Sequence, residues 1–476
     1  MNIKKISSSI VAVALILLIV IPLVTFNWKQ GKLSKSENRY LAGFPQLFNS
    51  EGNFSETLGD DATSWFEDNL GIRDELISFS GRIEYNIFHR SPNYKVELGK
   101  EGWLFYTQDN NLEIAKGKYP NFDENVLEEI CNQQILIQKK LNSQGIDYVL
   151  ILPASKVSIY PEYIQSGDYS ITTTPADILA NYIEEHSDIK VIRLKDALLK
   201  AKSSSDNLLY YKTDSHWNHY GQYVGYCETV SKLNEYGILS SGAVPVSFSE
   251  RESIGDLSSM IGNTSSKYEE TVPVMNIENQ TATLITGGEK YEKLQSIVKS
   301  NGFTSGAMYK NSIDAPRMLL YGDSMFDDKL LPLLAENASE LSYYRGFSIT
   351  QEAIDLAQPD VVFLEVGERL LAGLVSYTED YIRTKIDVNY DNMTMDIYYR
   401  DKYQYENMWF PTWSEENGQD DITWYRAERN EDGLWHVTID LNNYDSNGIY
   451  NIHFYSGTDT CKEYVYKTTY DVEIPR

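Results

Sequence analysis

The stretch Arg317-Met-Leu-Leu-Tyr-Gly-Asp-Ser-Met-Phe326 decides which fold is expected of this chain. A short apolar run, Met318 to Tyr321, is typical of a buried parallel strand. The run ends at Gly322-Asp-Ser324, and the apolar spacing from Phe326 onward predicts a helix. A serine at a strand-to-helix turn lies at the carboxyl edge of a sheet, where helix N–H groups can stabilise an oxyanion. The alternative is that the Asp or the Ser only caps the helix, since both are favoured there.

Strands and helices alternate around this stretch. Apolar strands are predicted at Asp147 to Leu152, Ile189 to Leu194, Glu340 to Arg345 and Val361 to Glu365, and amphipathic helices at Glu124 to Leu141 and Pro175 to Glu185. This alternation predicts an α/β fold with a parallel sheet between two layers of helices. Residues 31–93 are predicted to be mostly helical, and residues 237–315 to form an insertion of strands and loops.

A second stretch that carries chemistry is Tyr210-Tyr-Lys-Thr-Asp-Ser-His-Trp-Asn218. Asp214 and His216 are two residues apart, so an extended backbone places both side chains on one face. A carboxylate can then hold one imidazole nitrogen while the other faces a nucleophile, which is the arrangement of a general base. The alternatives are a metal pair, although no cluster with a third ligand is evident nearby, and a polar turn whose histidine only donates hydrogen bonds. His219 begins the next predicted helix and is interpreted as structural.

Composition narrows the classes of partner. The chain has 476 residues, 42 Lys+Arg and 69 Asp+Glu, for a net charge of -27. This charge excludes a nucleic-acid partner and makes a strongly anionic polymer a poor substrate unless cations bridge the two. The cysteines, Cys131, Cys227 and Cys461, have neither metal-ligand spacing nor the pattern of a disulfide framework.

The N-terminus has the features of an uncleaved membrane anchor. Lys4 and Lys5 precede an apolar run from Ile10 to Val24, which Phe26 and Trp28 extend to about the length of a bilayer. Small residues expected before a signal-peptidase site do not follow the run, and cleavage remains the alternative. We therefore expect residues 1–28 to form a cytoplasmic stub and anchor, with the rest of the chain outside the cell.

Residues 386–476 are predicted to form a separate all-β domain. The segment has alternating, aromatic-rich runs separated by turn residues such as Asn447-Gly448, and no convincing helix. Short strands at regular intervals over such a length predict a β-sandwich. Exposed tryptophans in this segment could stack on sugar rings, although we expect most of them to lie in the core.

The chain resembles a known family of permuted SGNH hydrolases, the extracytoplasmic polysaccharide O-acetyltransferases of alginate O-acetylation, and the related DHHW proteins. The resemblance covers about residues 37–371. It is carried by Glu37-Asn-Arg39, Gly99-Lys-Glu-Gly-Trp-Leu-Phe105, Lys156 with Ile159-Tyr-Pro-Glu162, Thr213-Asp-Ser-His-Trp217, Gly255-Asp-Leu257 with Met260, Gly322-Asp-Ser324, and Glu365 with Glu368-Arg369. The Asp-x-His-Trp motif precedes the Gly-Asp-Ser turn, which is the order in this family. Ser215 stands where DHHW proteins have a second histidine.

The C-terminal segment resembles a Bsp-like repeat of Gram-positive surface proteins. This resemblance is carried by Pro411-Thr-Trp-Ser-Glu-Glu-Asn-Gly-Gln-Asp-Asp-Ile-Thr-Trp-Tyr425, Asp432-Gly-Leu-Trp435 and Gly448-Ile-Tyr-Asn-Ile-His-Phe-Tyr455. The domains expected are thus the anchor at 1–28, an SGNH hydrolase-like acyltransferase domain at 29–385, and a Bsp-like β-sandwich at 386–476.

The family resemblance implies a function and a site. Ser324 would be the nucleophile, His216 the base and Asp214 its orienting carboxylate. Residues expected to contact the substrate are Lys156, Asn218, Tyr344, Arg345, Glu365 and Arg369, with Glu365, Glu368 and Arg369 also considered as a structural ion pair. The reaction implied is O-acetylation of a surface or secreted polysaccharide, without cofactor or metal, with acetyl groups supplied by a multi-spanning membrane O-acyltransferase. The alternatives are an acetyl-esterase with the same triad and a non-catalytic polysaccharide-binding scaffold.

Overall fold

The structure is a computed structural model that describes residues 16–472, apart from residues 18–19, 29–32, 35–38, 49–53, 56, 89, 120–121, 166–172, 263–268, 327–328, 402, 417, 432, 445–446 and 459. Much of the expected anchor, residues 10–24, and the motif residues Glu37 and Asn38 therefore lie outside the described residues. Among the helices that are described, none combines the length and the apolar character needed to cross a membrane.

The centre of the molecule is a seven-stranded sheet with the order β6-β5-β13-β11-β12-β10-β9. Its strands are β5 (Asp147–Leu152), β6 (Lys190–Arg193), β9 (Thr283–Leu284), β10 (Gly306–Lys310), β11 (Arg317–Gly322), β12 (Glu340–Arg345) and β13 (Val361–Glu365). The five strands from β6 to β12 in this order run parallel, whereas β10 and β9 join antiparallel at one edge. The predicted parallel sheet is thus confirmed for its central strands, and the segment expected to be an insertion supplies its antiparallel edge.

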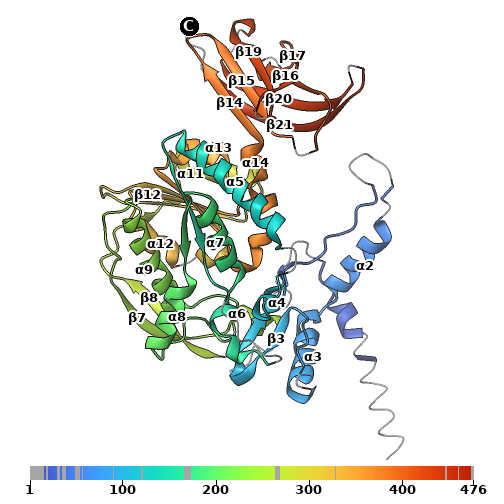
Figure 1. Cartoon of the computed structure of the whole chain (residues 1–476). Helices are drawn as coiled ribbons and strands as arrows, with labels where there is room; N and C mark the ends of the chain where they lie inside the picture. Colours follow the sequence, from blue (N-terminus) through green and yellow to red (C-terminus); the bar gives the residue numbers. More distant parts are fainter. Residues whose placement is uncertain are drawn as a thin grey trace, which may run out of the picture.

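Helices cover both faces of this sheet, as Figure 1 shows. The helices are α5 (Glu124–Asn142), α7 (Pro175–His186), α11 (Glu289–Ser300), α13 (Gln351–Ala357) and α14 (Leu374–Arg383) on one face, and α6 (Lys156–Ile159), α8 (Lys195–Ser204), α9 (His219–Glu235) and α12 (Leu330–Ala335) on the other. Alternate residues of each strand enter different core clusters, for example Tyr148 and Val149 in β5. This alternation is the reason that both faces of the strands are apolar.

The two helices predicted before β5 and β6 form because their first turns are capped. The Asp123 side chain accepts a hydrogen bond from Val126 N–H at the start of α5. In α7, Thr174 and Asp177 form a reciprocal capping box, and Pro175 occupies the first turn, where its missing N–H costs nothing. Both helices end within one residue of the predicted positions.

Two elements differ from the sequence-based prediction. The helix expected from Phe326 begins only at Leu330, and a short 3-10 turn, η4 (Ser324–Phe326), follows the strand instead. The expected insertion also contains a twelve-residue helix, α11, whose Leu294 and Ile297 are buried in the core. Polar residues between its apolar positions concealed this helix in the sequence. In the same segment β7 (Val246–Ser253) and β8 (Glu270–Ile277) pair as an antiparallel hairpin. The short helix α10 (Asp256–Met260) lies in the connection between these two strands.

The C-terminal segment forms two four-stranded sheets that share one core. The first has the order β14-β15-β19-β18 and the second β17-β16-β20-β21. The strands are β14 (Thr384–Asn389), β15 (Thr394–Tyr399), β16 (Met408–Ser414), β17 (Thr423–Arg426), β18 (Glu428–Arg429), β19 (Trp435–Asp440), β20 (Gly448–Gly457) and β21 (Lys462–Val472). Met395, Phe410 and Phe454 from the two sheets pack in the same cluster. These sheets agree with the predicted β architecture, although β14 and the central strand β16 were not anticipated as strands.

The junction with the central sheet is made through α14, which leads directly into β14 (Figure 1). The Lys140 ammonium of α5 donates to the carbonyls of Tyr381 and Thr384, and burial lowers its pKa to about 8. The Arg383 guanidinium lies 4.7 Å from the centre of the Tyr466 ring in β21. Side chains of α5 and β21 therefore hold the residues at which α14 ends and β14 begins.

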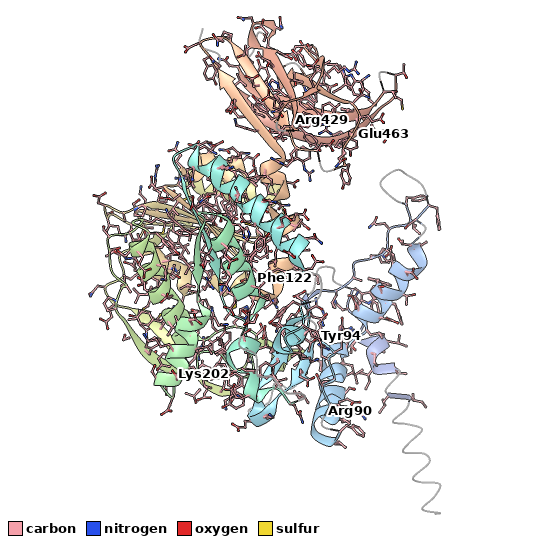
Figure 2. All side chains as sticks on the ribbon, viewed as in Figure 1. Arg90, Tyr94, Phe122, Lys202, Arg429 and Glu463 are labelled. Carbon is pink, nitrogen blue, oxygen red and sulfur yellow. The ribbon has the colours of Figure 1, made fainter. Side chains whose placement is uncertain are left out.

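The N-terminal part contributes helices and small sheets rather than strands of the main sheet. It comprises β1 (Leu33–Ser34), β2 (Arg39–Tyr40), α2 (Leu58–Asn69), α3 (Arg73–Phe88), β3 (Val96–Leu98), the 3-10 turn η1 (Lys100–Gly102), β4 (Leu104–Tyr106) and α4 (Asn111–Ala115). The mostly helical character predicted for residues 31–93 is confirmed for the described residues. Figure 2 shows Arg90 and Tyr94, which lie between α3 and β3 in the sequence.

Candidate active site

The turn after β11 places Ser324 at the carboxyl edge of the central sheet. β11 ends at Gly322, and a Cβ atom at that position would lie 2.5 Å from Oε2 of Glu365 on the neighbouring strand. Only glycine fits this close approach, because the Glu365 carboxyl lies beneath the turn. The Asp323 N–H donates to Glu365 Oε2 at 2.8 Å, and Met325 N–H donates to Asp323 Oδ1 at 2.7 Å. The carboxyl groups of Glu365 and Asp323 therefore fix the conformation of the turn.

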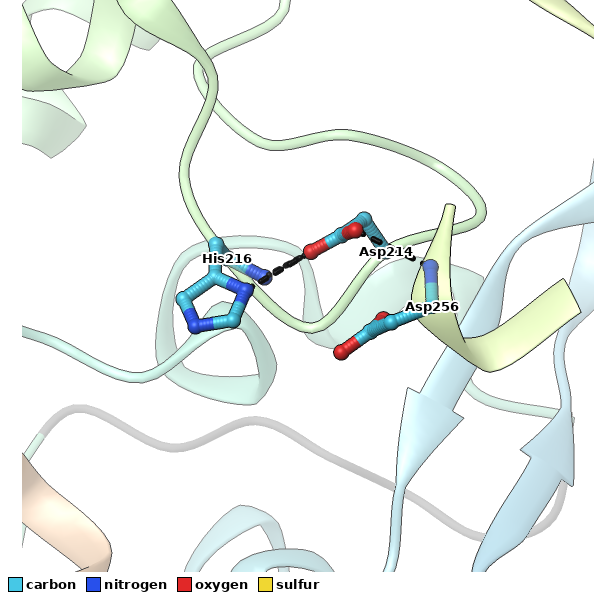
Figure 3. A group of neighbouring side chains, drawn as sticks. All are labelled: Asp214, His216 and Asp256. Carbon is cyan, nitrogen blue, oxygen red and sulfur yellow. Dashed lines mark hydrogen bonds and ion pairs between the residues drawn. The ribbon is translucent and has the colours of Figure 1, made fainter. Parts of the chain in front are cut away.

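His216 reaches this turn from the loop between α8 and α9. Its Nε2 lies 2.8 Å from Ser324 Oγ. Its Nδ1 lies 2.8 Å from Asp214 Oδ1, and this contact is drawn in Figure 3. The next residue along the loop, Trp217, is fully buried and donates its indole N–H to Met325 O at 2.8 Å. The loop with the histidine and the turn with the serine are thus joined by a second contact, which lies next to the Ser-His contact.

The electrostatics of the pair are set by opposing effects. Burial lowers the pKa of His216, but the hydrogen bond and charge of Asp214 outweigh it, so the pKa lies above its ordinary value. For Asp214, burial raises the pKa, while the hydrogen bond and charge of His216 lower it to about 2 overall. Asp214 is therefore ionised at neutral pH, and its side chain retains only 22% of its exposure.

Asp256 is a second aspartate beside His216, and it was not among the site residues predicted from the sequence (Figure 3). Its N–H donates to Asp214 Oδ2 at 3.0 Å, and its two carboxylate oxygens accept from the N–H and hydroxyl of Ser215. Burial and the nearby Asp214 carboxylate raise its pKa. Ser215, at the position of the second DHHW histidine, therefore ties the two aspartates together.

This cluster corrects the expectation that no third metal-type ligand lies near the Asp-x-His pair. Ligand-type atoms of Asp214, His216 and Asp256 all lie within 4.8 Å of one another. Every carboxylate oxygen of the two aspartates, however, accepts a hydrogen bond from a protein N–H or O–H group. These side chains therefore form a hydrogen-bonded network that holds the His216 imidazole.

Two buried groups hold the loop from below. The Lys156 ammonium donates to the carbonyls of Leu104, Lys212 and Asp214 at 2.6–3.0 Å, and burial lowers its pKa to about 7. Glu270 of β8 accepts from the N–H groups of Lys212 and Thr213. Lys156, expected to contact substrate, is buried, and its ammonium is bonded to the main chain behind Asp214.

Two further residues expected to contact substrate, Asn218 and Tyr344, are also buried. Asn218 is buried and caps α9, where its amide oxygen accepts from Tyr220 and Gly221 N–H and its NH2 donates to Leu208 O. Tyr344 points into the core on the opposite face of the sheet, stacked 5.7 Å from the ring of Tyr321. The adjacent Tyr343 is the tyrosine that reaches the site, because its hydroxyl donates to Asp323 O at 2.9 Å.

Of the remaining residues expected to contact substrate, some support the serine turn and others line a cavity. Glu365 is fully buried beneath the serine turn, and burial and the Asp323 carboxylate raise its pKa well above its ordinary value. It does not form the ion pair considered with Arg369, whose guanidinium lies 3.9 Å from Asp109 and over the Tyr106 ring. Arg345 is half-buried and lines the cleft, as predicted.

A cleft of about 310 Å³ opens in front of the serine and histidine. Its walls come from the loop before α9, from the β7–β8 hairpin and from the end of β12. It is lined by Tyr211, Asp214, His216, Trp217, His219, Gln222, Arg251, Ser253, Gly255, Glu270, Ser324 and Arg345. His219, expected to be structural, is buried and accepts from Met275 N–H. The volume suits one small polar group or sugar unit.

A second, smaller cavity of about 40 Å³ lies on the other side of His216. Arg369 and Tyr106 line it together with Asp323 and the buried Glu368, which accepts from Ser158 Oγ.

A serine hydroxyl within hydrogen-bond distance of an imidazole, itself held by a carboxylate, can be deprotonated as it attacks a carbonyl carbon. The geometry therefore suits acyl transfer at the lip of a polar cleft.

Two families match separate parts of the chain. Residues 96–291 match the family described as SGNH hydrolase-like domain, acetyltransferase AlgX, and residues 382–470 match the GBS Bsp-like repeat. The first segment includes Asp214 and His216 and ends before Ser324. A search of curated proteins found no match.

Among solved structures, weak likenesses occur to three bacterial proteins. The O-acetyltransferase domain of Pseudomonas putida AlgJ has 15% identity and a TM-score of 0.40, over 60% of this chain and 96% of that one. Bacillus cereus PatB1 has 16% identity and a TM-score of 0.41, over 58% and 98%. Pseudomonas aeruginosa AlgX has 13% identity and a TM-score of 0.39, over 74% and 88%. Residues 96–291 are thus similar to the SGNH hydrolase-like domain of the AlgX acetyltransferase, and residues 382–470 are similar to the Bsp-like repeat.

Proposed function

We propose that this protein is an extracytoplasmic O-acetyltransferase that modifies hydroxyl groups of a cell-surface or secreted polysaccharide. The observation that carries the proposal is the continuous chain of contacts from Ser324 Oγ through His216 to Asp214 at the cleft. The match to the AlgX acetyltransferase domain supports acetyl transfer as the reaction class.

In the first half-reaction, Ser324 Oγ attacks the carbonyl carbon of an acetyl ester while His216 Nε2 accepts the hydroxyl proton. The tetrahedral intermediate collapses, the ester C–O bond breaks, and His216 returns the proton to the leaving alkoxide. The products are acetyl-Ser324 and the free alcohol of the donor. Asp214 keeps the Nδ1–H of the imidazole directed at its carboxylate, which fixes the tautomer and stabilises the imidazolium.

In the second half-reaction, a sugar hydroxyl enters the cleft and loses its proton to His216 as its oxygen attacks the acetyl carbon. The bond to Ser324 Oγ breaks, and the proton on His216 returns to the serine oxygen. Arg345, at the end of β12, lies where it can contact the sugar or the acyl donor. An esterase would use water in place of the sugar hydroxyl, so the acceptor alone distinguishes the two reactions.

The location and partners belong to the same proposal. Lys4, Lys5 and the apolar run from Ile10 to Val24 support a membrane anchor with the remaining chain outside the cell. Because acetyl-CoA is an intracellular donor, an extracytoplasmic enzyme needs acetyl groups delivered across the membrane, which a multi-spanning O-acyltransferase would do. Protease added to intact cells should then remove residues 29–476 and leave an N-terminal fragment in the membrane.

The test is a transfer assay with the full-length protein in mild detergent. An activated acetyl ester and neutral or acidic oligosaccharides are incubated with the protein, and the products are weighed by mass spectrometry. We expect acetylated oligosaccharide from the wild type and none above background from Ser324→Ala. The matched control is Ser203→Ala, on an exposed face of α8, where the hydroxyl donates only to Lys200 O. Release of acetate with no acetylated sugar would assign the protein as an esterase instead.

A further inference from the structure

The outward face of one C-terminal sheet carries aromatic side chains that the core does not use. In β16, Met408 and Phe410 point into the core, so the alternating Trp409 and Trp413 point outward. Aromatic side chains at neighbouring outward positions of β17, β20 and β21 lie on the same face as these two tryptophans. We name this surface the outer aromatic face, defined by Trp409, Trp413, Trp424, His453, Tyr455 and Tyr464.

The rings of the outer aromatic face contact one another in a continuous layer. Trp424 lies 5.1 Å from Tyr455, Tyr455 lies 5.7 Å from Tyr464, and His453 lies 4.6 Å from Trp413, all between ring centres. Trp409 and Trp413 are nearly covered and form the floor, whereas Trp424 is 46% exposed and Tyr464 is 54% exposed. Large aromatic rings therefore remain in contact with solvent on this face.

Cationic side chains lie among these rings. The Lys462 ammonium is 4.7 Å from the centre of the Trp409 ring and 5.6 Å from that of Trp424. Arg426 stands opposite Trp409 in the register, and Lys467 stands opposite His453. Burial, and then the charge of Lys467, lower the pKa of His453, so this histidine is neutral at physiological pH.

The local charge of this face is the opposite of the charge of the whole chain. By the strand registers, Asp471 at the far end of β21 is the one carboxylate at an outward position within the described lengths of these four strands. Glu463, labelled in Figure 2, pairs with the inward-pointing Ser456. Because screening limits exposed charges to about 8 Å at physiological ionic strength, a ligand on this face meets Arg426, Lys462 and Lys467 rather than the net charge of -27.

We infer that the outer aromatic face binds an acidic polysaccharide, with pyranose rings stacked on Trp424 and Tyr464 and acidic groups facing Lys462 and Arg426. Sugar rings present apolar C–H faces that pack on aromatic rings, while their carboxylate or phosphate groups pair with cations. That the ligand is a glycan rests on the proposed function; that it is acidic rests on the charges of this face. The surface would hold the polymer while its hydroxyls are acetylated at the separate cleft.

The experiment measures binding in a protein that cannot turn over. Full-length Ser324→Ala protein in mild detergent is titrated with polygalacturonate and, separately, with dextran as the uncharged glycan. The test variants are Trp424→Ala and Lys462→Gln. The matched controls are Tyr403→Ala, another exposed aromatic of the C-terminal segment, and Lys385→Gln. Like Lys462, Lys385 lies over an aromatic ring, 5.3 Å from the centre of Tyr398.

We expect polygalacturonate to bind more tightly than dextran, with affinity falling as salt rises. Trp424→Ala and Lys462→Gln should each weaken binding by about fivefold or more, while the two controls bind as before. Equal binding of both glycans, no binding of either, or unchanged affinity in both test variants would overturn the inference. Acetyl transfer to a short oligosaccharide should be the same with and without Trp424→Ala, so failure of the proposed function appears in that assay alone.

Discussion

Replacement of Asp214 by asparagine tests how the carboxylate acts on His216. The carboxylate accepts from His216 Nδ1, from His216 N–H and from Asp256 N–H. Its pKa is lowered from 3.8 to about 2, which corresponds to a preference for the ionised form of about 2 kcal/mol. This contribution is complete above pH about 4 and disappears as the pH falls through 2, so Asp214→Asn should cost about 2 kcal/mol of stability at neutral pH.

The same substitution should move the pH dependence of the reaction. Catalysis needs neutral His216, so kcat/KM should rise as the pH increases through the raised pKa of this residue. Without the Asp214 carboxylate the effect of burial remains, and the rising limb should move to lower pH. The rate should also fall by about 10²–10⁴-fold, since the asparagine no longer fixes the tautomer.

The assay is acetyl transfer as a function of pH, with urea unfolding of the same variants. Asp256→Asn is compared with Asp214→Asn, because the charge of Asp256 acts on His216 less strongly than that of Asp214. The rising limb of the pH profile should therefore move less in Asp256→Asn. The matched control is Asp396→Asn, which removes the carboxylate 2.9 Å from His436 in the C-terminal segment and should leave the profile unchanged. A limb that stays in place or moves upward in Asp214→Asn would refute the reasoning.

Three further predictions concern the support of the site and the division of the chain. Lys156→Met removes donors from three buried carbonyls and should lower the free energy of unfolding by about 3 kcal/mol or more in urea titrations; a loss below about 1 kcal/mol would contradict this role. Gly322→Ala places a Cβ 2.5 Å from Glu365 Oε2 and should lower Tm and activity, while Gly59→Ala, whose Cβ meets nothing within 4 Å, should not. Residues 386–476 should fold alone as an all-β unit, and a helical circular dichroism spectrum of that fragment would count against the division.

The strands of the central sheet could be predicted closely because their sequences allow little else. Asp147–Leu152 and Val361–Glu365 were predicted with their observed bounds, since each is a short apolar run that both core faces cover. The pairing of Ser324 with His216 was implied by the family resemblance, because His216 lies in the loop between α8 and α9 rather than at the end of a strand. The helix after Ser324 was harder to place, because a 3-10 turn and α12 share the apolar spacing of one longer helix.

The support of the site could not be predicted from local patterns. Tyr343 and Tyr344 are adjacent in a strand, so one must point to each face, and the sequence alone does not say which one reaches Asp323. Asp256 lies 42 residues from Asp214, and only the folded loop brings its N–H to that carboxylate. One signal was present: Gly255 packs against the main chain of Thr213, a close approach that any side chain would prevent.

Labelling with a serine-directed fluorophosphonate probe tests the central claim most directly. The full-length protein is incubated with the probe, digested, and analysed by mass spectrometry to locate the adduct. The account predicts a single adduct on Ser324, lost in Ser324→Ala and strongly slowed in His216→Ala, with both variants folded as judged by circular dichroism. An adduct on any other residue, or labelling of His216→Ala at the rate of the wild type, would contradict it.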